Sequence, residues 1–450
     1  MIEFRASRLA IVGTIAVLVA ACGGGTAPSS GGTSPSTPPA AQSSNPSAAV
    51  GDGPANLVIA VREHFAPGMK TLAEEYRKTN DNVAIEIQSL PNAEAEFTQR
   101  IVTAHLGGQE ADIIEHLDTY VDEFAANGVT TDLLPYFAKK QDLTAEDFLP
   151  QFLDQYRPLD KPDQVHGMPV SADATVVFFN KDLFAEAGVA EPAGDWTWQD
   201  MTTAAKKITV AGQGKYWGMA PGDLWQAVYN PMIKAYGGFV YDKDKKVSGI
   251  GEPAAIEAWT QLLTPMIDGS FAPYDIVRGQ AAPQFPAGQV AMMIGVRAHT
   301  PGFRDGLKAA WDVVTMPTAN GQPVVGGGSY GLAITEASKS KDAAFKFLAW
   351  FYRTDGGMKT LQETYQVMPP TADGVDNGLW RNLPAPPANT AAFATDVKVA
   401  VLSTHLPGRA QAVLADAVTE ATEKVLLNGV SIEEAFGEAQ KKVNDALTSN

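Results

Sequence analysis

One serine of the sequence stands in a pattern that is typical of serine hydrolases. Ser329 lies in Gly327-Gly328-Ser329-Tyr330-Gly331, which matches G-x-S-x-G. In those enzymes the serine occupies a sharp turn between a strand and a helix, and the turn exposes its hydroxyl as a nucleophile. Here Leu332-Ala333-Ile334 continues as a strand, and helical periodicity starts only near Lys341. The context disfavours catalysis, so a secreted hydrolase that uses Ser329 is kept only as a minor alternative.

Other catalytic and metal-binding patterns are weak. The six histidines are scattered and form no H-x-x-x-H pair. His116 and Asp118 could hold a cation, but Asp118 is equally suited to cap a helix that begins near Thr119. Glycoside hydrolysis needs two carboxylates at a defined separation. The sequence has 51 acidic residues, so their abundance alone identifies no catalytic pair. We therefore expect a protein that is not an enzyme and that needs no metal or cofactor.

Cys22 is the only cysteine among the 450 residues, and it ends a segment with the parts of a secretion signal. Basic residues precede an apolar run over 9–18, and Val19-Ala20-Ala21 stands directly before the cysteine. The apolar run is short for a membrane span, which needs about 20 residues. The pattern resembles the bacterial lipobox, in which a diacylglycerol is attached to the thiol. We expect residues 1–21 to be a lipoprotein signal peptide and Cys22 to be lipidated. The alternatives are a plain secretory signal and a membrane anchor with an incidental cysteine.

The segment after Cys22 has the composition of a linker. Residues 23–52 are mostly Gly, Ser, Thr, Pro and Ala. Such a segment buries too little apolar surface to offset its ordering entropy, so we expect 22–53 to be the lipidated cysteine and a disordered tether. The body from residue 54 onward has 397 residues, which is enough for two lobes.

The chain is strongly acidic, with a formal net charge of −17. Arg5, Arg8 and Glu3 give the signal a charge of +1, so the mature chain is near −18. A negative long-range field repels nucleic acids and anionic lipid surfaces. We therefore expect no nucleic-acid partner, and no membrane contact except through the lipid anchor on Cys22.

The first third of the body alternates strands and helices. β-Branched runs predict strands at 57–61, 83–87 and 111–114, and apolar residues at helical spacing predict helices at 67–78 and 95–106. This order is typical of a parallel sheet with right-handed crossovers.

A second α/β region begins near residue 174. We expect strands at 174–179 and 290–294, and an extended glycine-rich run over 324–334. Asp195 or Thr197 is a plausible N-cap for the helix that runs to 208. Helices are expected up to 208 and at 224–236, 254–267, 341–352, 415–427 and 432–447.

Several strings of the body occur in a characteristic order. They are Gly167–Asp173 with Phe178–Phe184, Thr197-Trp198 ahead of Ala204–Ile208, Phe285–Met292, and Gly328–Ile334 ahead of Ala343–Leu348. Together they resemble the extracellular solute-binding proteins of ABC importers, in the sugar-binding family that includes maltose-binding protein. The resemblance covers roughly residues 54–450.

The resemblance implies an α/β protein with a two-lobe fold like that of the type II periplasmic binding proteins, with hinge crossings and a cleft between the lobes. Closure around a ligand would be a hinge motion, and an ABC permease would recognise the closed form. Lobe 1 would comprise 54–172 and 329–366, and lobe 2 would comprise 173–328 and 367–450. The crossings would lie near 171–174, 326–329 and 365–368.

Strand ends nominate the first candidate site residues. In open α/β sheets, ligands lie beyond the carboxyl ends of strands. The loops after the first and third predicted strands contain Glu63 with His64, and His116 with Asp118. Their side chains could exchange hydrogen bonds with sugar hydroxyls. For Asp118, helix capping and ligand contact stay equally open.

The remaining candidates depend on the resemblance. Trp225 and Tyr229 are four apart and share a helical face, and the match to the family's cleft helix favours stacking of a sugar ring on Trp225. Core packing is the alternative. Arg297 follows a strand where the family often has a cleft residue, and its planar fork suits paired hydroxyls or an anion; a solvated surface charge is the alternative. The resemblance adds Asp173, Ser329, Tyr330, Met368 and Arg409.

We therefore expect a lipid-anchored monomer on the extracytoplasmic face of a bacterial cell membrane. It would capture a mono- or oligosaccharide and deliver it to the transmembrane subunits of an ABC permease. A glycerophosphodiester or another polar solute is the alternative ligand. A lipoprotein scaffold that binds other proteins is a further alternative, and two hinged lobes argue against it.

Overall fold

The computed structural model describes residues 55–139, 142–221, 224–277, 284–382 and 384–449. The chain divides into two units, Met1–Ala49 and Val50–Asn450, and all described residues belong to the second. The predicted signal, Cys22 and the tether lie outside the described residues. Within the described part, no helix is both long and apolar enough to cross a membrane.

The first sheet has the strand order β2-β1-β3-β15-β4. β1 is parallel to β2 and to β3, as the alternation of strands and helices predicted. β15 comes from far along the chain and pairs antiparallel with β3. We call the part of the molecule built on this sheet lobe 1. Its strands are β1 (Ala55–Arg62), β2 (Val83–Leu90), β3 (Ile113–Leu117), β4 (Met168–Pro169) and β15 (Tyr330–Ile334).

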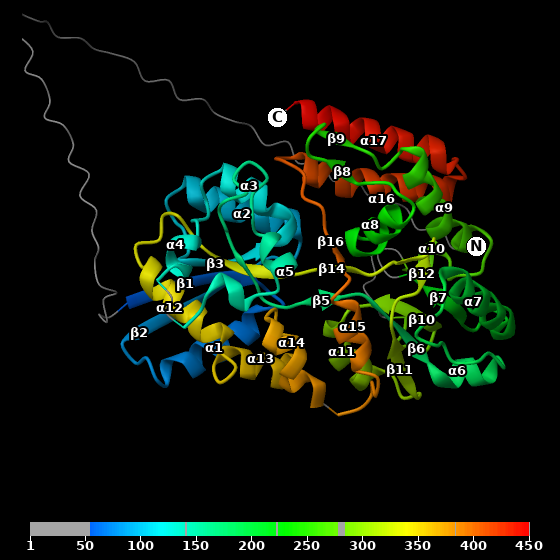
Figure 1. Cartoon of the computed structure of the whole chain (residues 1–450), viewed down its shortest axis with the longest axis horizontal. Coiled ribbons are helices and arrows are strands. Elements are labelled where there is room, and N and C mark those ends of the chain that lie inside the picture. Colours follow the sequence, from blue (N-terminus) through cyan, green and yellow to red (C-terminus); the bar gives the residue numbers. More distant parts are fainter. Residues whose placement is uncertain (1–54, 140–141, 222–223, 278–283, 383, 450) are drawn as a thin grey trace, which may run out of the picture. The chain divides into compact units, whose positions relative to one another are not determined.

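Helices cover both faces of the lobe 1 sheet (Figure 1). Successive side chains of a strand point to opposite faces. Leu57, Ile59 and Val61 therefore pack with α1 (Ala66–Arg77), α12 (Lys341–Tyr352) and α13 (Gly357–Tyr365), whereas Ala60 packs with α2 (Glu94–Leu106) and α3 (Val121–Ala126). The remaining elements of lobe 1 are short: α4 (Leu134–Phe137), η2 (Ala145–Asp147) and α5 (Pro150–Asp154).

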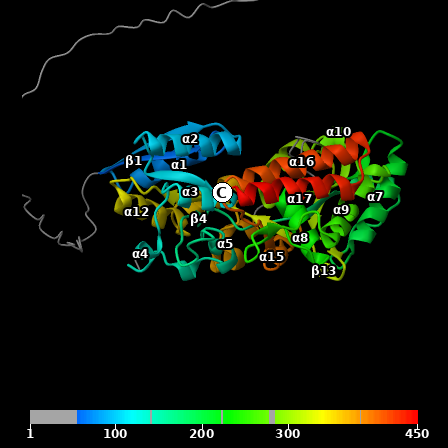
Figure 2. The ribbon, with the colours of Figure 1, turned by 90° about the horizontal axis from the view of Figure 1, so that it is seen from above.

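The second sheet has the order β11-β6-β10-β7 and forms the basis of lobe 2. Its strands are β6 (Val176–Asn180), β7 (Trp217–Ala220), β10 (Val290–Gly295) and β11 (Trp311–Val314). β10 is antiparallel to β6 and parallel to β7, so the sheet is mixed. The last two helices, α16 (Ala410–Asn428) and α17 (Ile432–Thr448), pack on each other and on α9 (Pro253–Ile267) (Figures 1 and 2).

The other elements of the second half are mostly short. They are α6 (Lys181–Glu186), α7 (Trp198–Gly212), α8 (Gln226–Ala235), the β8–β9 hairpin (Tyr241–Asp242 and Val247–Ser248), α10 (Tyr274–Val277), η3 (Arg297–His299), α11 (Thr300–Gly306), the β12–β13 hairpin (Thr318–Ala319 and Gln322–Pro323), α14 (Ala372–Asn377), η4 (Leu379–Asn382) and α15 (Ala391–Asp396). Of the two predicted N-cap residues, Thr197 and not Asp195 caps α7, because the Thr197 hydroxyl accepts a hydrogen bond from the Asp200 backbone N–H at 3.1 Å.

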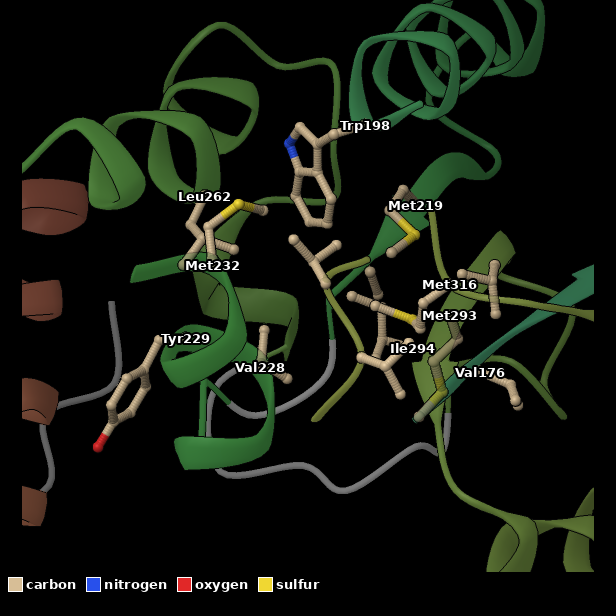
Figure 3. Close-up of a cluster of buried hydrophobic side chains, with 14 of the residues drawn as sticks. Val176, Trp198, Met219, Val228, Tyr229, Met232, Leu262, Met293, Ile294 and Met316 are labelled. Atoms are coloured by element: carbon tan, nitrogen blue, oxygen red, sulfur yellow. The ribbon is translucent and has the colours of Figure 1, made fainter. Parts of the chain in front are cut away.

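One apolar cluster fills lobe 2. The sheet contributes Met219 and Met293, and the helices above it contribute Trp198, Met232 and Leu262 (Figure 3). Tyr229 belongs to the same cluster but lies at its edge, with its ring pointing away from the methionines of the sheet (Figure 3). The cluster fixes the position of α8, and the start of α8 later forms part of the candidate site.

A short three-stranded sheet, which we call the hinge sheet, joins the lobes. Its order is β16-β14-β5, formed by Val401–Leu402, Gly326–Gly328 and Asp173–Ala174. A third crossing runs beside it, where the Ala172 N–H donates to the Met368 carbonyl at 2.9 Å. The sequence did not predict β16, which pairs parallel with β14.

The hinge strand β14 consists of three glycines because its neighbours approach too closely for side chains. A Cβ on Gly326 would lie 1.7 Å from the Ala227 carbonyl oxygen in α8. A Cβ on Gly327 would lie 2.8 Å from the Asp173 carbonyl oxygen, and one on Gly328 would lie 3.0 Å from Asp118 Oδ2. The absence of side chains therefore lets lobe 1, lobe 2 and the hinge meet at one place.

We predict that Gly326→Ala lowers the free energy of unfolding by about 3 kcal/mol or more, because the new methyl group would displace the backbone of α8. Gly437→Ala is the matched control. Gly437 is exposed in α17 and an added Cβ would meet nothing within 4 Å, so alanine should stabilise by about 0.5–1 kcal/mol. Urea denaturation measures both changes. A Gly326→Ala protein with the parent's urea midpoint would contradict the seating of α8 against β14.

Candidate ligand-binding site

A cavity of about 720 Å³ lies where the two lobes and the hinge sheet meet. Lobe 1 contributes the carboxyl ends of β1 and β3, which is where the strand-end rule places a site. The hinge contributes Asp173 and 328–330, and lobe 2 contributes the start of α8, the segment after β10 and one face of α16. The volume suits a small ligand.

On the lobe 1 wall, a guanidinium is already bound by a carboxylate. Arg62 ends β1, and its Nε and Nη2 donate to Glu115 Oε1 at 2.8 and 2.6 Å. The other oxygen of Glu115 accepts the Arg62 backbone N–H at 2.8 Å. Arg62 Nη1 lies 3.7 Å from Glu94 Oε1. The charge of Arg62 is therefore compensated within lobe 1.

Asp118 links lobe 1 to the hinge. It is the first residue of η1 (Asp118–Tyr120), and the Thr119 backbone N–H bonds to its carboxylate. Its Oδ2 also accepts the Ser329 backbone N–H at 3.1 Å, and the residue lines the cavity. Burial raises the pKa of Asp118 to about 7, against the opposing effect of the Ser329 N–H. Asp118 forms no ion pair with any other residue in the described ranges.

The hinge holds the polar groups of Ser329 within its own backbone. Ser329 Oγ donates to the Tyr330 carbonyl at 2.6 Å and accepts the Ser171 N–H at 3.2 Å. Residues 326–331 match G-x-S-x-G and also G-x-G-x-x-G, but they run from β14 into β15 and not into a helix. Both the nucleophile elbow and the dinucleotide motif need a helix there. Ser329 is thus a hinge residue at the cavity wall.

Asp173 and Tyr330 occupy neighbouring positions of the hinge wall. The Asp173 carboxylate accepts a hydrogen bond from Ser171 Oγ, and burial raises the pKa of Asp173. The Tyr330 ring packs edge-on against Phe65, with 5.3 Å between the ring centroids. Both residues line the cavity, as the resemblance implied. Their contact with a ligand stays a prediction.

On the lobe 2 wall, two aromatic side chains differ in exposure. Trp225 stands directly before α8 and is 42% exposed, although it is a large apolar residue. Tyr229, one turn later, is only 3% exposed and packs on Trp259 with 5.0 Å between ring centroids. Both line the cavity. Trp225 therefore presents an open ring, whereas Tyr229 belongs mainly to the core.

Arg297 does not lie on the cavity wall. Its Nη2 donates to the Trp380 carbonyl at 3.1 Å, and its guanidinium carbon lies 4.8 Å from the Trp380 ring and 5.4 Å from that of Phe393. It is 1% exposed, and burial lowers its pKa to about 10. From the sequence, Arg297 was expected to be either a cleft residue or a solvated surface charge. The side chain instead lies between aromatic rings behind the wall, whereas its neighbours Val296 and Ala298 line the cavity.

Glu63 and His64 also lie outside the lining of the cavity. Both are exposed and contact Asn92: His64 Nδ1 lies 3.0 Å from Asn92 Oδ1, and Glu63 Oε2 accepts from Asn92 Nδ2 at 3.4 Å. The strand-end rule identified the correct edge of the sheet, but Arg62, one residue earlier, is the residue of this loop that lines the cavity.

Three further candidates lie away from the cavity. His116 is fully buried between Phe124 and Tyr156, and burial lowers its pKa to about 3. Its side chain alternates with those of Glu115 and Leu117 along β3, so it points to the other face of the sheet. Met368 is buried at the third crossing, and Arg409 is exposed just before α16.

The family model of the bacterial extracellular solute-binding proteins matches residues 63–358. The chain belongs to this family. A Brucella abortus (strain 2308) protein with a provisional description as a binding protein is 24% identical over 313 residues, which span 66% of this chain and 71% of that protein.

Solved structures of solute-binding proteins have the same fold. The ABC substrate-binding protein Lmo0181 of Listeria monocytogenes, in complex with cycloalternan, has a TM-score of 0.78 at 24% identity, over 88% of this chain and 99% of that one. The sugar-binding protein MalE of Xanthomonas citri has a TM-score of 0.73 at 18% identity, over 88% and 98% of the two chains. UgpB of Mycobacterium tuberculosis, in complex with glycerophosphocholine, has a TM-score of 0.71 at 18% identity, over 87% and 98%. The predicted two-lobe, type II periplasmic-binding-protein fold is confirmed.

Several wall residues of this solute-binding protein were missed by the sequence reasoning. Gln411, Thr419 and Thr422 line the cavity from α16, and the buried hydroxyl oxygen of Thr422 has no hydrogen-bond partner among the described residues. Their spacing puts them on one face of α16, and polar residues on an otherwise apolar helical stripe were a usable signal. Metal-binding clusters of three or more His, Cys, Asp or Glu residues are absent from the part of the chain that the structure describes.

We predict that Asp118→Asn changes how stability depends on pH. Folding raises the pKa of Asp118 from 3.8 to about 7, so between these values the folded state binds a proton that the unfolded state does not. The contribution of Asp118 to stability therefore falls as pH rises from 4 to 7. The melting temperature of Asp118→Asn relative to the parent should rise over this range and then level off. Asp244→Asn, at an exposed carboxylate, is the control. A difference in melting temperature between Asp118→Asn and the parent that stays constant from pH 4 to pH 8 would contradict the raised pKa of Asp118.

Proposed function

We propose that this solute-binding protein captures a carbohydrate in the cavity and delivers it to the transmembrane subunits of an ABC permease. The observation that carries the proposal is the exposed ring of Trp225 at a wall that also contains Asp118 and Asp173. A sugar has apolar C–H faces, which pack on aromatic rings, and hydroxyl edges, which bond to carboxylates. The wall offers both kinds of partner.

The related structures support the same class of ligand. The Listeria protein is in complex with cycloalternan, and the Xanthomonas protein is described as sugar-binding. A cavity of about 720 Å³ is compatible with a mono- or small oligosaccharide. We propose that the lobes comprise 54–172 with 329–366 and 173–328 with 367–450, and that they close around the ligand by a hinge motion.

A glycerophosphodiester is the second candidate, because UgpB of Mycobacterium tuberculosis is in complex with glycerophosphocholine. A phosphodiester needs a free cationic donor. Arg62 is the only Lys or Arg of the described cavity lining, and Glu115 already binds it. The carbohydrate therefore fits the described wall better.

Thermal-shift screening tests the ligand class. The panel contains mono- and oligosaccharides, polyols and glycerophosphocholine. A ligand at 100 times its Kd should add about 2.7 kcal/mol to the free energy of unfolding, so binding is easy to detect. Stabilisation by glycerophosphocholine or by a class outside the panel, with none by any saccharide, would overturn the carbohydrate proposal.

We predict that Trp225→Ala weakens binding of the stabilising saccharide about tenfold or more, because the open ring loses its stacking partner. The melting temperature of the empty protein should change little, since the side chain is 42% exposed. Leu379→Ala is the matched control, because Leu379 is equally exposed and does not line the cavity. Calorimetric titration measures the affinity. A Trp225→Ala protein that unfolds, or that keeps full affinity, would show that Trp225 is not a binding residue.

We further propose that residues 1–21 are a lipoprotein signal peptide, that Cys22 carries a lipid, and that 22–53 tether a monomer to the extracytoplasmic face of the membrane. The support is the lipobox-like Val19-Ala20-Ala21-Cys22 and the linker composition that follows it. A slack tether would keep the receptor near its permease while the lobes remain free to close.

Cys22→Ser should release the protein from the membrane fraction while its affinity for ligand stays unchanged, because the anchor and the cavity are separate parts of the chain. Membrane fractionation and titration of the released protein measure the two effects. A mutant that stays in the membrane fraction would contradict the lipid anchor, and one that loses affinity would contradict the separation of anchor and site.

A further inference from the structure

The described wall of the cavity carries more negative than positive charge. Glu94, Asp118 and Asp173 line it, and Arg62 is the single Lys or Arg among the described lining residues. Two groups directly behind the wall, Glu115 and Arg297, add one charge of each sign. The excess of carboxylates therefore remains when the buried neighbours are included.

Neither arginine is available to a ligand. Arg62 Nε and Nη2 both donate to Glu115, and Nη1 faces Glu94 at 3.7 Å. Arg297 is 1% exposed and lies between the rings of Trp380 and Phe393. An anionic ligand would thus meet carboxylates without a free guanidinium to bind it.

Asp118 and Asp173 flank the same backbone position. Asp173 pairs with Gly328 across the hinge sheet, and Asp118 Oδ2 would lie 3.0 Å from a Cβ on Gly328. Each carboxylate accepts a hydrogen bond from a neutral group, the Ser329 N–H for Asp118 and the Ser171 hydroxyl for Asp173. Burial raises the pKa of both carboxyl groups. The positive charge of the buried Arg297 acts on Asp173 and opposes this rise, whereas Asp118 has no such cationic neighbour among the described residues. A cation beside Gly328 would supply the opposite charge that Asp118 lacks and would add to that of Arg297 at Asp173.

The aromatic part of the wall also suits a cation. The exposed Trp225 ring can accept a cation over its face as well as a sugar ring. Rings of Tyr120, Tyr229, Tyr274 and Tyr330 line the same cavity. The net charge of −17 adds a long-range field that attracts cations and repels anions.

We propose that the cavity selects a saccharide that carries a protonated amino group, with the ammonium beside Asp118 and Asp173 and the sugar ring on Trp225. This inference rests on the proposed function and names the class of carbohydrate. Neutral sugars lack the charge that would compensate the two carboxylates, and sugar phosphates carry the wrong sign.

Calorimetric titration with matched sugars tests the proposal. The sets are glucosamine, N-acetylglucosamine and glucose; galactosamine, N-acetylgalactosamine and galactose; and the β-1,4 glucosamine disaccharide, its N-acetylated form and cellobiose. Glucose 6-phosphate is the anionic probe. In at least one set the amino sugar should bind about tenfold more tightly than its neutral and acetylated counterparts at pH 7, and the preference should shrink with added salt.

Two outcomes separate this inference from the proposed function. The amino-sugar inference is overturned if, in every set, a neutral or acetylated sugar binds as tightly as its amino counterpart, or if glucose 6-phosphate is the best ligand. Either result leaves the carbohydrate-binding proposal intact. Absence of binding by every saccharide overturns both.

Variants of the two carboxylates give an independent test. Asp118→Asn and Asp173→Asn should each weaken binding of the amino sugar about tenfold more than binding of its neutral counterpart, because asparagine can still hydrogen-bond to a hydroxyl but carries no negative charge. A merely structural role would weaken both sugars equally, and that result overturns the proposal. Asp244→Asn should leave the preference unchanged. If Asp173→Asn does not fold, Asp118→Asn carries the test, since we expect it to be more stable than the parent above pH 7.

Discussion

The close approach of backbones at the glycine strand β14 is the constraint on which the rest of the structure depends. Without side chains at Gly326–Gly328, the carbonyl of Ala227 in α8, the strand β5 and the carboxylate of Asp118 can all lie against one short segment. These three neighbours come from lobe 2, the hinge and lobe 1. Because all three pack against Gly326–Gly328, they enclose a cavity whose walls come from different parts of the chain.

Most polar groups of the hinge are hydrogen-bonded to one another. The groups that could contact a ligand are therefore other side chains of the cavity wall. Ser329, Ser171 and the Tyr330 carbonyl bond to one another, and Arg62 is bound by Glu115. What remains open to a ligand are the Trp225 ring and the carboxylates of Asp118 and Asp173. On the proposed function, this arrangement would bind a solute through stacking and hydrogen bonding, and it would gain affinity from a ligand that brings its own positive charge.

The sequence predicted the elements that local patterns encode. The strands β1, β2, β6 and β10 and the helices α1, α2, α9 and α12 lie within a few residues of their expected positions, because β-branched runs and helical spacing report local preferences.

β16 was missed because Val401–Leu402 are only two residues and gain their pairing from distant Gly326–Gly327. Arg297 was misplaced for a related reason. Its burial depends on Trp380 and Phe393, which follow it by more than 80 residues, and no local signal reports such contacts.

The most direct test of the account is a crystal structure of the protein purified from its own host without added ligand, together with mass spectrometry of the molecule that co-purifies. The account predicts density for an amino-bearing saccharide in the cavity, with its ring on Trp225 and its nitrogen beside Asp118 and Asp173. A bound anionic solute, or a ligand held elsewhere on the protein while this cavity stays empty, would contradict it.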